Sequence, residues 1–391
     1  MDFGSLIHSL SDEMLMGIHG LIAHPNMIIM WLVGAVLIYL AVWKDYEPTL
    51  LLPMGVGAII ANIPFSSAIT TTPGEEGFLF LLYNMGIKTE LFPVLIFIAI
   101  GAMCDFGPLM QNPSVMLFAA AAQVGIFVTA IGATVLGFSF NHAAAIGIIG
   151  AADGPSTIFV ASRYAVDLLG PLSVAAYCYM ALVPVIQPPV IRLITSKEER
   201  SIRMGYEDTK PISRKAKFLF PIMIIVVAGV IAPISVALIG ALMFGNILKE
   251  SGVVPSLARC AENELSNLVT LLLGITVGAT MEADKFLNYQ VLLIMGLGAV
   301  AFVFDTVGGV LFAKVLNMFT KKKINPMIGA CGISAFPMSG RVIAKMALQE
   351  DPTNFIIQHS IGVNVAGQVA SVVAAGVVLA LIPALQQLLG V

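Results

Sequence analysis

Residues 147–159 read GIIGAADGPSTIF, an apolar stretch in which Asp153 is the one charged residue. Gly154 and Pro155 follow the aspartate directly. Proline lacks a backbone N–H and clashes with the preceding helical turn, so a helix that runs through this stretch has to break. The stretch therefore predicts a helix interruption with a carboxylate beside freed backbone carbonyls.

The composition assigns this interruption to a membrane protein. The chain has 391 residues, of which 58% are hydrophobic and 11% are charged, whereas soluble domains carry about 25% charged residues. Its apolar runs are continuous and long enough for helices, which excludes a transmembrane barrel of alternating strands. The net charge of −3 indicates no nucleic-acid surface. The scattered cysteines, without a CxxC motif, predict neither a disulfide framework nor a zinc site and are interpreted as packing residues: Cys104, Cys178, Cys260 and Cys331.

The apolar segments form two groups on either side of one polar loop. They fall at 27–43, 48–64, 91–103, 114–136 and 171–194, and then at 218–232, 233–248, 265–280, 290–316 and 355–387. The loop, residues 195–217, is rich in Lys and Arg, so the positive-inside rule predicts that it is cytoplasmic and that both termini lie outside. Residues 1–26 lack the features of a signal peptide and predict an amphipathic interfacial segment.

The two groups resemble each other as internal repeats. IAIGAMCDF (98–106) resembles ITVGATMEA (275–283), and GIIGAADGPS (147–156) matches GACGISAFPM (329–338) in register. About five crossings per copy is an odd number, so the second copy is inverted in the bilayer. We therefore expect an all-α polytopic membrane protein with two inverted-topology repeats of about five transmembrane helices, residues 27–194 and 218–391, each with a re-entrant or broken helical segment.

In inverted-repeat folds the ion and substrate site lies near the midplane, where the interrupted helices meet. The predicted interruptions are 143–160 and 325–345. A hard cation such as sodium prefers carboxylate, carbonyl, amide and hydroxyl oxygens, and Asp153 would supply the charge. A proton could occupy Asp153 instead. The alternative is that Asp153 merely caps a helix at the membrane surface, with Gly-Pro as an ordinary turn.

Other polar residues at depth add candidates with alternatives of their own. Ser334 and Arg341 lie in the second interruption, where the serine could simply ease helix packing and the arginine could anchor at the interface. Asn364, Gln368 and Ser371 recur at spacings of four and three and so share one helix face. For Gln368 and Ser371, interhelical hydrogen bonding is the preferred interpretation.

One tyrosine and three acidic residues complete the candidates. Tyr177 is interpreted as part of an interfacial aromatic belt. Asp305, in VAFVFDTVGGV, could be a second ion ligand or a relay, although no helix break adjoins it. Asp105 and Glu282 end their segments, which favours solvated loop positions.

The motifs GAADGPSTIF and NPMIGACGISAFPMSGR closely resemble the β subunit of the biotin-dependent, sodium-pumping decarboxylases. That family includes oxaloacetate, methylmalonyl-CoA, glutaconyl-CoA and malonate decarboxylases, and the likeness runs from about residue 30 onward. The resemblance implies that a peripheral carboxyltransferase carboxylates biotin on a carrier. The membrane subunit then decarboxylates the carboxybiotin, exports sodium and consumes a proton.

The resemblance also implies roles for seven residues. Asp153 falls on the essential aspartate and Tyr179 on the tyrosine of the following helix. The sodium ligands it implies are Asp153, Asn325, Gly329, Ser334 and Asn364. Tyr179 and Ser334 are candidate proton donors, and the implied contacts to carboxybiotin are Arg341, whose guanidinium suits a planar carboxylate, and Asn325.

The chain has no Walker motif, dinucleotide fingerprint or Met-Lys-Met biotinylation motif, so the energy has to come from partners. The resemblance implies Na+ and partner-borne carboxybiotin as cofactors. Its implied partners are a carboxyltransferase α subunit, a small membrane γ or δ subunit and a biotin carrier protein, in a bacterial cytoplasmic (inner) membrane; a homo-oligomer is left open. Two alternatives remain, a sodium- or proton-coupled secondary transporter of a small organic anion and a structural scaffold of the same enzyme.

Overall fold

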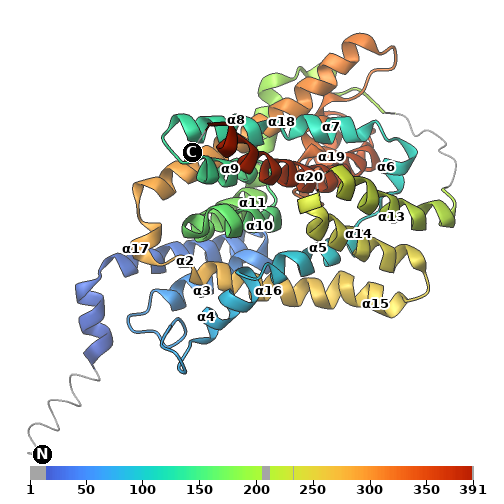
Figure 1. Cartoon of the computed structure of the whole chain (residues 1–391). Helices are drawn as coiled ribbons and strands as arrows, with labels where there is room; N and C mark the ends of the chain where they lie inside the picture. The colour runs from blue at the N-terminus through green and yellow to red at the C-terminus, as the bar shows by residue number, and fades with distance from the viewer. Residues whose placement is uncertain (1–14, 205–211, 232, 390–391) are drawn as a thin grey trace, which may run out of the picture. The chain divides into compact units, whose positions relative to one another are not determined.

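The computed structural model describes residues 15–204, 212–231 and 233–389, and Figure 1 shows the course of the chain. Within these ranges every regular element is a helix and no strand occurs, which confirms the predicted all-α class. The longer helices are α2 (Asn26–Lys44), α3 (Pro48–Ala61), α5 (Leu91–Met103), α7 (Val115–Ala122), α8 (Val124–Val135), α9 (Phe140–Ile148), α10 (Gly154–Tyr164), α11 (Leu169–Ile194), α13 (Arg214–Ile231), α14 (Val236–Ser251), α16 (Ser266–Ala279), α18 (Tyr289–Phe319), α19 (Met338–Glu350) and α20 (Ile357–Leu389). Short helical turns connect them, among them α4 (Phe78–Leu82), α6 (Gly107–Gln111), α12 (Lys197–Arg200), α15 (Pro255–Cys260) and α17 (Ala283–Phe286).

Six helices of the described chain are long and apolar enough to cross a membrane, or seven if 78–87 and 91–103 count as one broken span. The six are Asn26–Lys44, Val115–Val135, Val166–Ile194, Pro233–Ser251, Tyr289–Phe319 and Ile357–Ala384. The chain is therefore a multi-pass membrane protein. The sequence contains more apolar segments than this because some form short helices. Both α3 and α16 have 14 residues, about 21 Å at 1.5 Å per residue, against a hydrocarbon core of about 30 Å.

The chain divides into two compact units. One comprises Met1–Leu91 and Asn267–Leu293, and the other comprises Phe92–Ser266 and Ile294–Val391. Each unit takes segments from both halves of the sequence, so the units do not coincide with the expected repeats. Of the expected N-terminal segment, residues 1–14 lie outside the described residues, while 15–23 are helical.

In the first unit, small residues let helices approach closely. A Cβ built on Gly34 would lie 2.8 Å from the Gly55 carbonyl oxygen, and one built on Gly55 would lie 2.6 Å from that of Gly34. Asn62, which follows α3, donates its amide to the Met281 carbonyl at 2.7 Å and accepts from the Ala283 N–H at 2.8 Å. Backbone groups at the end of α3 and the start of α17 are thereby paired, as a low-dielectric environment requires.

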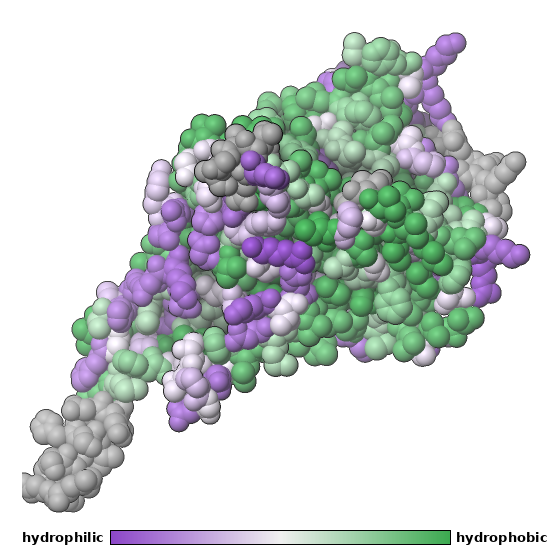
Figure 2. All heavy atoms as spheres, viewed as in Figure 1, coloured by the Kyte–Doolittle hydropathy of each residue, from purple (hydrophilic) through white to green (hydrophobic). Residues whose placement is uncertain are grey.

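The second unit contains every candidate site residue except Glu282. Its most thoroughly buried spans are α11 and α20, and α20 packs against α7, α19 and the 3-10 helix η6 (Pro326–Gly332) (Figure 1). Figure 2 shows apolar side chains gathered over α13 and α14. Leu219, Met223, Val230 and Phe244 are exposed there, as expected for helices that face lipid rather than water.

Two ion pairs hold the described part of the polar loop against the C-terminal end of α19. Arg200 donates to Glu350 at 2.7 Å, and Arg203 donates to Asp351 at 2.6 Å. The hydrogen bond from Arg203 lowers the pKa of the Asp351 carboxyl to about 2, so this ion pair persists well into the acid range. Residues 205–211 of the expected 195–217 loop lie outside the described residues.

Candidate functional site

The first predicted helix break is present and has a defined geometry. Helix α9 ends at Ile148 and tightens into the 3-10 turn η2 (Ile149–Ala151), after which Ala152 adopts a left-handed φ of 49°. Asp153 is extended and caps α10, where Pro155 occupies a first-turn position that needs no N–H partner. The chain thus breaks and restarts its helix around one carboxylate.

Asp153 does cap a helix, as the surface alternative supposed, but it is buried, with 4% of its surface exposed. Its Oδ1 accepts from the Ser156 N–H at 3.1 Å, and its Oδ2 accepts from the Ser156 hydroxyl at 2.7 Å. Two more hydroxyls donate to the same Oδ2, Ser334 at 3.1 Å and Ser371 at 2.8 Å. Serine oxygens from three separate segments therefore surround one carboxylate oxygen.

The two predicted breaks meet at this carboxylate. The Ser334 N–H donates to the Ala151 carbonyl at 2.9 Å, so the second segment pairs its backbone with the η2 turn of the first. In the second segment, η6 ends at Gly332, Ile333 is extended, and α19 starts at Met338. Ser334 lies in the non-helical stretch between them.

The predicted polar face of α20 lines the same region. Asn364 donates to the carbonyls of Cys331 at 3.2 Å and Ile333 at 2.8 Å, and Gln368 donates to the Ser334 carbonyl. Gln368 therefore forms a hydrogen bond away from its own helix, although its partner Ser334 lies in a non-helical stretch rather than on a neighbouring helix. Ser371 goes further, because it contacts Asp153 itself. The Asn364 Oδ1 is buried and has no hydrogen-bond partner within the described chain.

Asn325 and Gly329 build the second segment without contacting Asp153. Asn325 caps η6 by accepting from the Met327 N–H at 3.1 Å, and it donates to the Arg200 carbonyl at 2.7 Å. A Cβ built on Gly329 would lie 2.0 Å from the Gly309 carbonyl oxygen, so only glycine permits this approach of η6 to α18. All polar atoms of the Asn325 side chain are thus engaged with backbone.

The tyrosines lie differently from their sequence interpretations. Tyr177, assigned to an interfacial belt, is buried with 3% exposure, which corrects that interpretation. A Cβ on Gly154 would fall 2.1 Å from its ring, so the ring packs against the residue after Asp153, and its hydroxyl has no partner among the described residues. Tyr179 donates instead to the Met295 carbonyl on α18. Arg341 is exposed in the first turn of α19.

Sequence reasoning underestimated Ser371 and missed Tyr177. The available signals were the spacing that sets Ser371 on the Asn364 face, and the spacing of two between Tyr177 and Tyr179, which turns them to different sides of α11. Asp105 is exposed and Glu282 is partly exposed, as their positions at segment ends predict.

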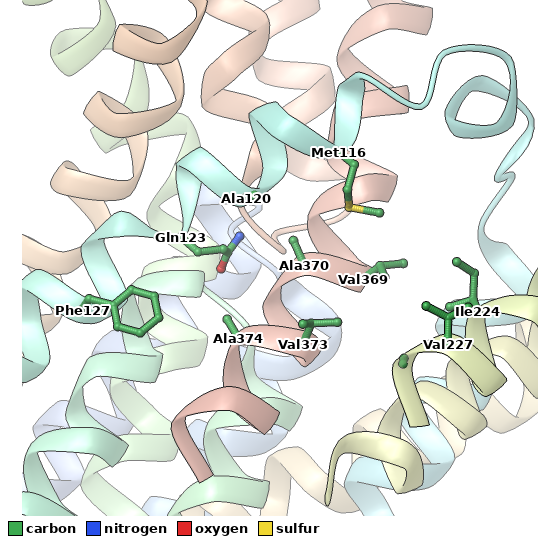
Figure 3. A pocket seen from close by; sticks show the side chains of 11 residues that line it. Met116, Ala120, Gln123, Phe127, Ile224, Val227, Val369, Ala370, Val373 and Ala374 are labelled. Atoms are coloured by element: carbon green, nitrogen blue, oxygen red, sulfur yellow. The ribbon is translucent and has the colours of Figure 1, made fainter. Parts of the chain in front are cut away.

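The second unit also contains a cavity. Figure 3 shows it between α7, α8, α13 and α20, with Gln123 as the polar residue among the side chains that line it. The other lining residues are Met116, Ala120, Phe127, Ile224, Val227, Ala228, Val369, Ala370, Val373 and Ala374. Neither Asp153 nor the three serines line this cavity, and its walls offer few oxygen atoms to a cation.

The comparison with known protein families is decisive. A family model described as the Na+-transporting oxaloacetate decarboxylase beta subunit matches residues 26–382. The chain belongs to this family. The resemblance drawn from the two motifs is confirmed, and the membership favours a decarboxylase subunit over a plain secondary transporter.

Curated relatives support the same membership. The beta subunit of glutaconyl-CoA decarboxylase from Acidaminococcus fermentans is 48% identical over 354 residues, which cover 90% of this chain and 92% of that protein. The beta subunit of methylmalonyl-CoA decarboxylase from Propionigenium modestum is 45% identical over 388 residues, with 93% and 96% covered. Oxaloacetate decarboxylase beta chain 2 of Salmonella typhi is 41% identical over 408 residues, with 90% and 94% covered. The chain is thus a β subunit of a Na+-transporting decarboxylase.

Proposed function

We propose that this subunit decarboxylates carboxybiotin presented by a biotin carrier partner, and that it couples this reaction to sodium export with consumption of a proton. The observation that carries the proposal is the buried Asp153 carboxylate with three serine hydroxyls on one oxygen. Burying an ionisable group inside a membrane protein costs free energy, so such a group marks a functional site. The residues come from both broken segments and from α20, so an ion bound here would sense the position of all three.

Sodium is the proposed ion at this site. In the described arrangement the hydroxyls of Ser156, Ser334 and Ser371 donate to Asp153. When a cation binds, these hydroxyl protons turn away and the same oxygens face the ion, as hard cations require. A proton on Asp153 would neutralise the empty site, so sodium and proton would alternate at one carboxylate.

Asn364 and the second segment would complete the sodium path. The unpartnered Oδ1 of Asn364 is an available neutral ligand. Ser371 lies seven positions further along α20, about 10 Å at 1.5 Å per residue. We therefore propose that Asn364 is a ligand for sodium at a neighbouring position of the path and not for the ion bound at Asp153. Asn325 and Gly329 would shape the segment through their backbone contacts.

Arg341 is proposed as the contact for the carboxylate of carboxybiotin. Its exposed position suits a group delivered by a partner, and guanidinium pairs with carboxylates in a planar, bidentate manner. Tyr179 and Ser334 remain proposed proton donors, and of these two Ser334 is hydrogen-bonded to Asp153.

The inverted repeat is part of the proposal. The register that aligns Gly147 with Gly329 also aligns Pro155 with Pro337, and the two segments so related exchange a backbone hydrogen bond. Alternate opening to each face would then follow from movement of one bundle against the other. The expected domain boundaries, 27–194 and 218–391 around a cytoplasmic loop, belong to this model.

The proposed partners are a carboxyltransferase α subunit, a small membrane γ or δ subunit and a biotin carrier, in a bacterial inner membrane. The named relatives belong to decarboxylases of glutaconyl-CoA, methylmalonyl-CoA and oxaloacetate. Such different substrates are compatible with one membrane subunit if the carboxyltransferase selects the substrate.

The hydroxyls of Ser156, Ser334 and Ser371 form a serine cage around the Asp153 carboxylate, and the cage makes a prediction for Ser371→Ala. The variant loses one oxygen at Asp153, and we expect the sodium concentration for half-maximal decarboxylation to rise about fivefold, since one such contact contributes about 1 kcal/mol. Ser360→Ala is the matched control on the same helix, because the Ser360 hydroxyl is buried but donates to the carbonyl of Ile356, the residue directly before α20. Equal sodium requirements for the two variants would argue against the cage.

The decarboxylase role is tested by supplying carboxybiotin on the purified carrier. The reconstituted complex should release CO2 from it only when this subunit is present and sodium is supplied. A pure carrier would instead exchange sodium in liposomes without any biotinylated protein, and sodium exchange of that kind without CO2 release would contradict the proposal.

A further inference from the structure

A second buried carboxyl lies in the same unit and is not part of the Asp153 cage. Asp305, on α18, has no exposed surface. Its Oδ1 accepts from the Gly125 N–H at 2.5 Å, at the start of α8, where free N–H groups favour negative charge. Its Oδ2 is buried and has no hydrogen-bond partner within the described residues. One oxygen of this carboxyl is therefore satisfied and the other is not.

The unsatisfied oxygen faces the first broken segment. A Cβ built on Gly150 would lie 2.7 Å from the Asp305 Oδ2 and 2.9 Å from the Ala301 methyl group. Gly150 lies within η2, three residues before Asp153. Sodium needs several oxygens around it, and a methyl group and a packed glycine backbone leave no such shell. A proton needs no extra volume, so the packing selects a proton over a metal ion.

The second broken segment is held by a side-chain donor at the position that corresponds to Asp305. If the register that aligns Gly150 with Gly332 is extended without a gap toward the N-terminus, Gln123 corresponds to Asp305. The Gln123 amide donates to the Gly332 carbonyl at 3.0 Å and to the Ala119 carbonyl at 3.2 Å. Gln123 thus holds its segment with a donor that is always present. A carboxyl group can donate a hydrogen bond only when it is protonated.

We propose that Asp305 is a proton-binding site that holds the first broken segment when protonated. The neutral carboxyl donates from Oδ2 to a backbone carbonyl of the η2 turn, as Gln123 does at Gly332. Loss of the proton removes this bond and loosens the segment that carries Asp153. The inference rests on the proposed sodium site at Asp153 and on the proposed register of the two repeats, and it adds a proton that controls how well the sodium site is assembled.

Few titratable groups lie on the elements around Asp305. Helices α7 and α8 carry none, as residues 115–135 read VMLFAAAAQVGIFVTAIGATV. Most groups on the other elements have partners of their own, which are His142 of α9 with Asp167, Lys314 of α18 with Glu199, Tyr179 of α11 with Met295, Cys331 of η6 with Ser339, and Asp153 beyond the break with its serines. Two groups of α11 are the exceptions. The Tyr177 hydroxyl has no hydrogen-bond partner among the described residues, although its ring packs against Gly154 beyond the break, and Cys178 is a free thiol.

The test compares wild type with Asp305→Asn in the assembled complex. The asparagine amide keeps an acceptor for Gly125 and supplies a permanent donor. The readout is the sodium concentration for half-maximal carboxybiotin decarboxylation across the pH range in which the complex is stable. Toward the alkaline end, wild type should need about two- to tenfold more sodium than the variant, the value of one hydrogen bond. At the acid end the two should coincide.

Proton competition at Asp153 raises the sodium requirement at low pH in wild type and variant alike. Its pH dependence is therefore opposite to that of the Asp305 effect, which raises the sodium requirement of wild type at high pH. Curves that coincide at every pH, or differ by one constant factor, would overturn the proposal. If Asp305→Asn does not assemble, Asp305→Ser, which also keeps a donor without an ionisable proton, has to show the same alkaline difference. Failure of the Asp153 proposal is distinguishable, because Asp153→Asn would then keep the sodium requirement of wild type.

Discussion

Asp153→Asn is expected to lower the sodium affinity of the assembled complex by about 100-fold or more, since removing one charge of a buried charge pair costs about 3 kcal/mol or more. Asparagine is as good a helix cap as aspartate, and its Oδ1 can still accept from the Ser156 N–H. Helix α10 should therefore still form, and the loss should be in ion binding. Equilibrium binding of radioactive sodium to the purified complex measures this directly.

Asp105→Asn is the matched control for that experiment. Asp105 also accepts from a backbone N–H, that of Gly107 at 2.9 Å, but its side chain is exposed. Its replacement should leave sodium binding unchanged. Wild-type affinity in Asp153→Asn, or an equal loss in Asp105→Asn, would remove Asp153 from the ion site.

Gly245→Ala is expected to have the largest effect on stability. A Cβ at Gly245 on α14 would lie 1.9 Å from the Ile98 carbonyl oxygen of α5. Backbone cannot yield as a flexible side chain does, so we expect a loss of about 3 kcal/mol or more in the free energy of unfolding. Thermal unfolding of the purified complex in detergent measures it.

The control lies on the same helix, one and a half turns away. A Cβ at Gly240 would meet nothing within 4 Å, so Gly240→Ala should be neutral or stabilise by up to about 1 kcal/mol through helix propensity. Similar thermal stability for the two variants would contradict the close α5–α14 contact.

The membrane class and the broken helices could be predicted because they depend on local features. Apolar runs define membrane helices by length, and Pro155 after Asp153 dictates a break wherever the chain goes. Helix lengths were less predictable. The apolar run 48–64 becomes the helix Pro48–Ala61, because the turn at Asn62 is set by its distant partners Met281 and Ala283.

The site was predictable in its parts but not in its contacts. Spacing sets Asn364, Gln368 and Ser371 on one face of α20, yet no pattern reveals that only Ser371 reaches Asp153. The side on which Tyr177 packs depends on the rotation of α11 against the first break. Such facts follow from tertiary packing, which a single sequence does not encode in any local period.

The most direct test of the account is sodium uptake into inverted vesicles that contain the complete complex, driven by decarboxylation, with CO2 release measured in the same sample. The account predicts that wild type accumulates sodium, and that Asp153→Asn assembles but loses both uptake and sodium-dependent CO2 release. An assembled Asp153→Asn complex that still accumulates sodium during decarboxylation would contradict it.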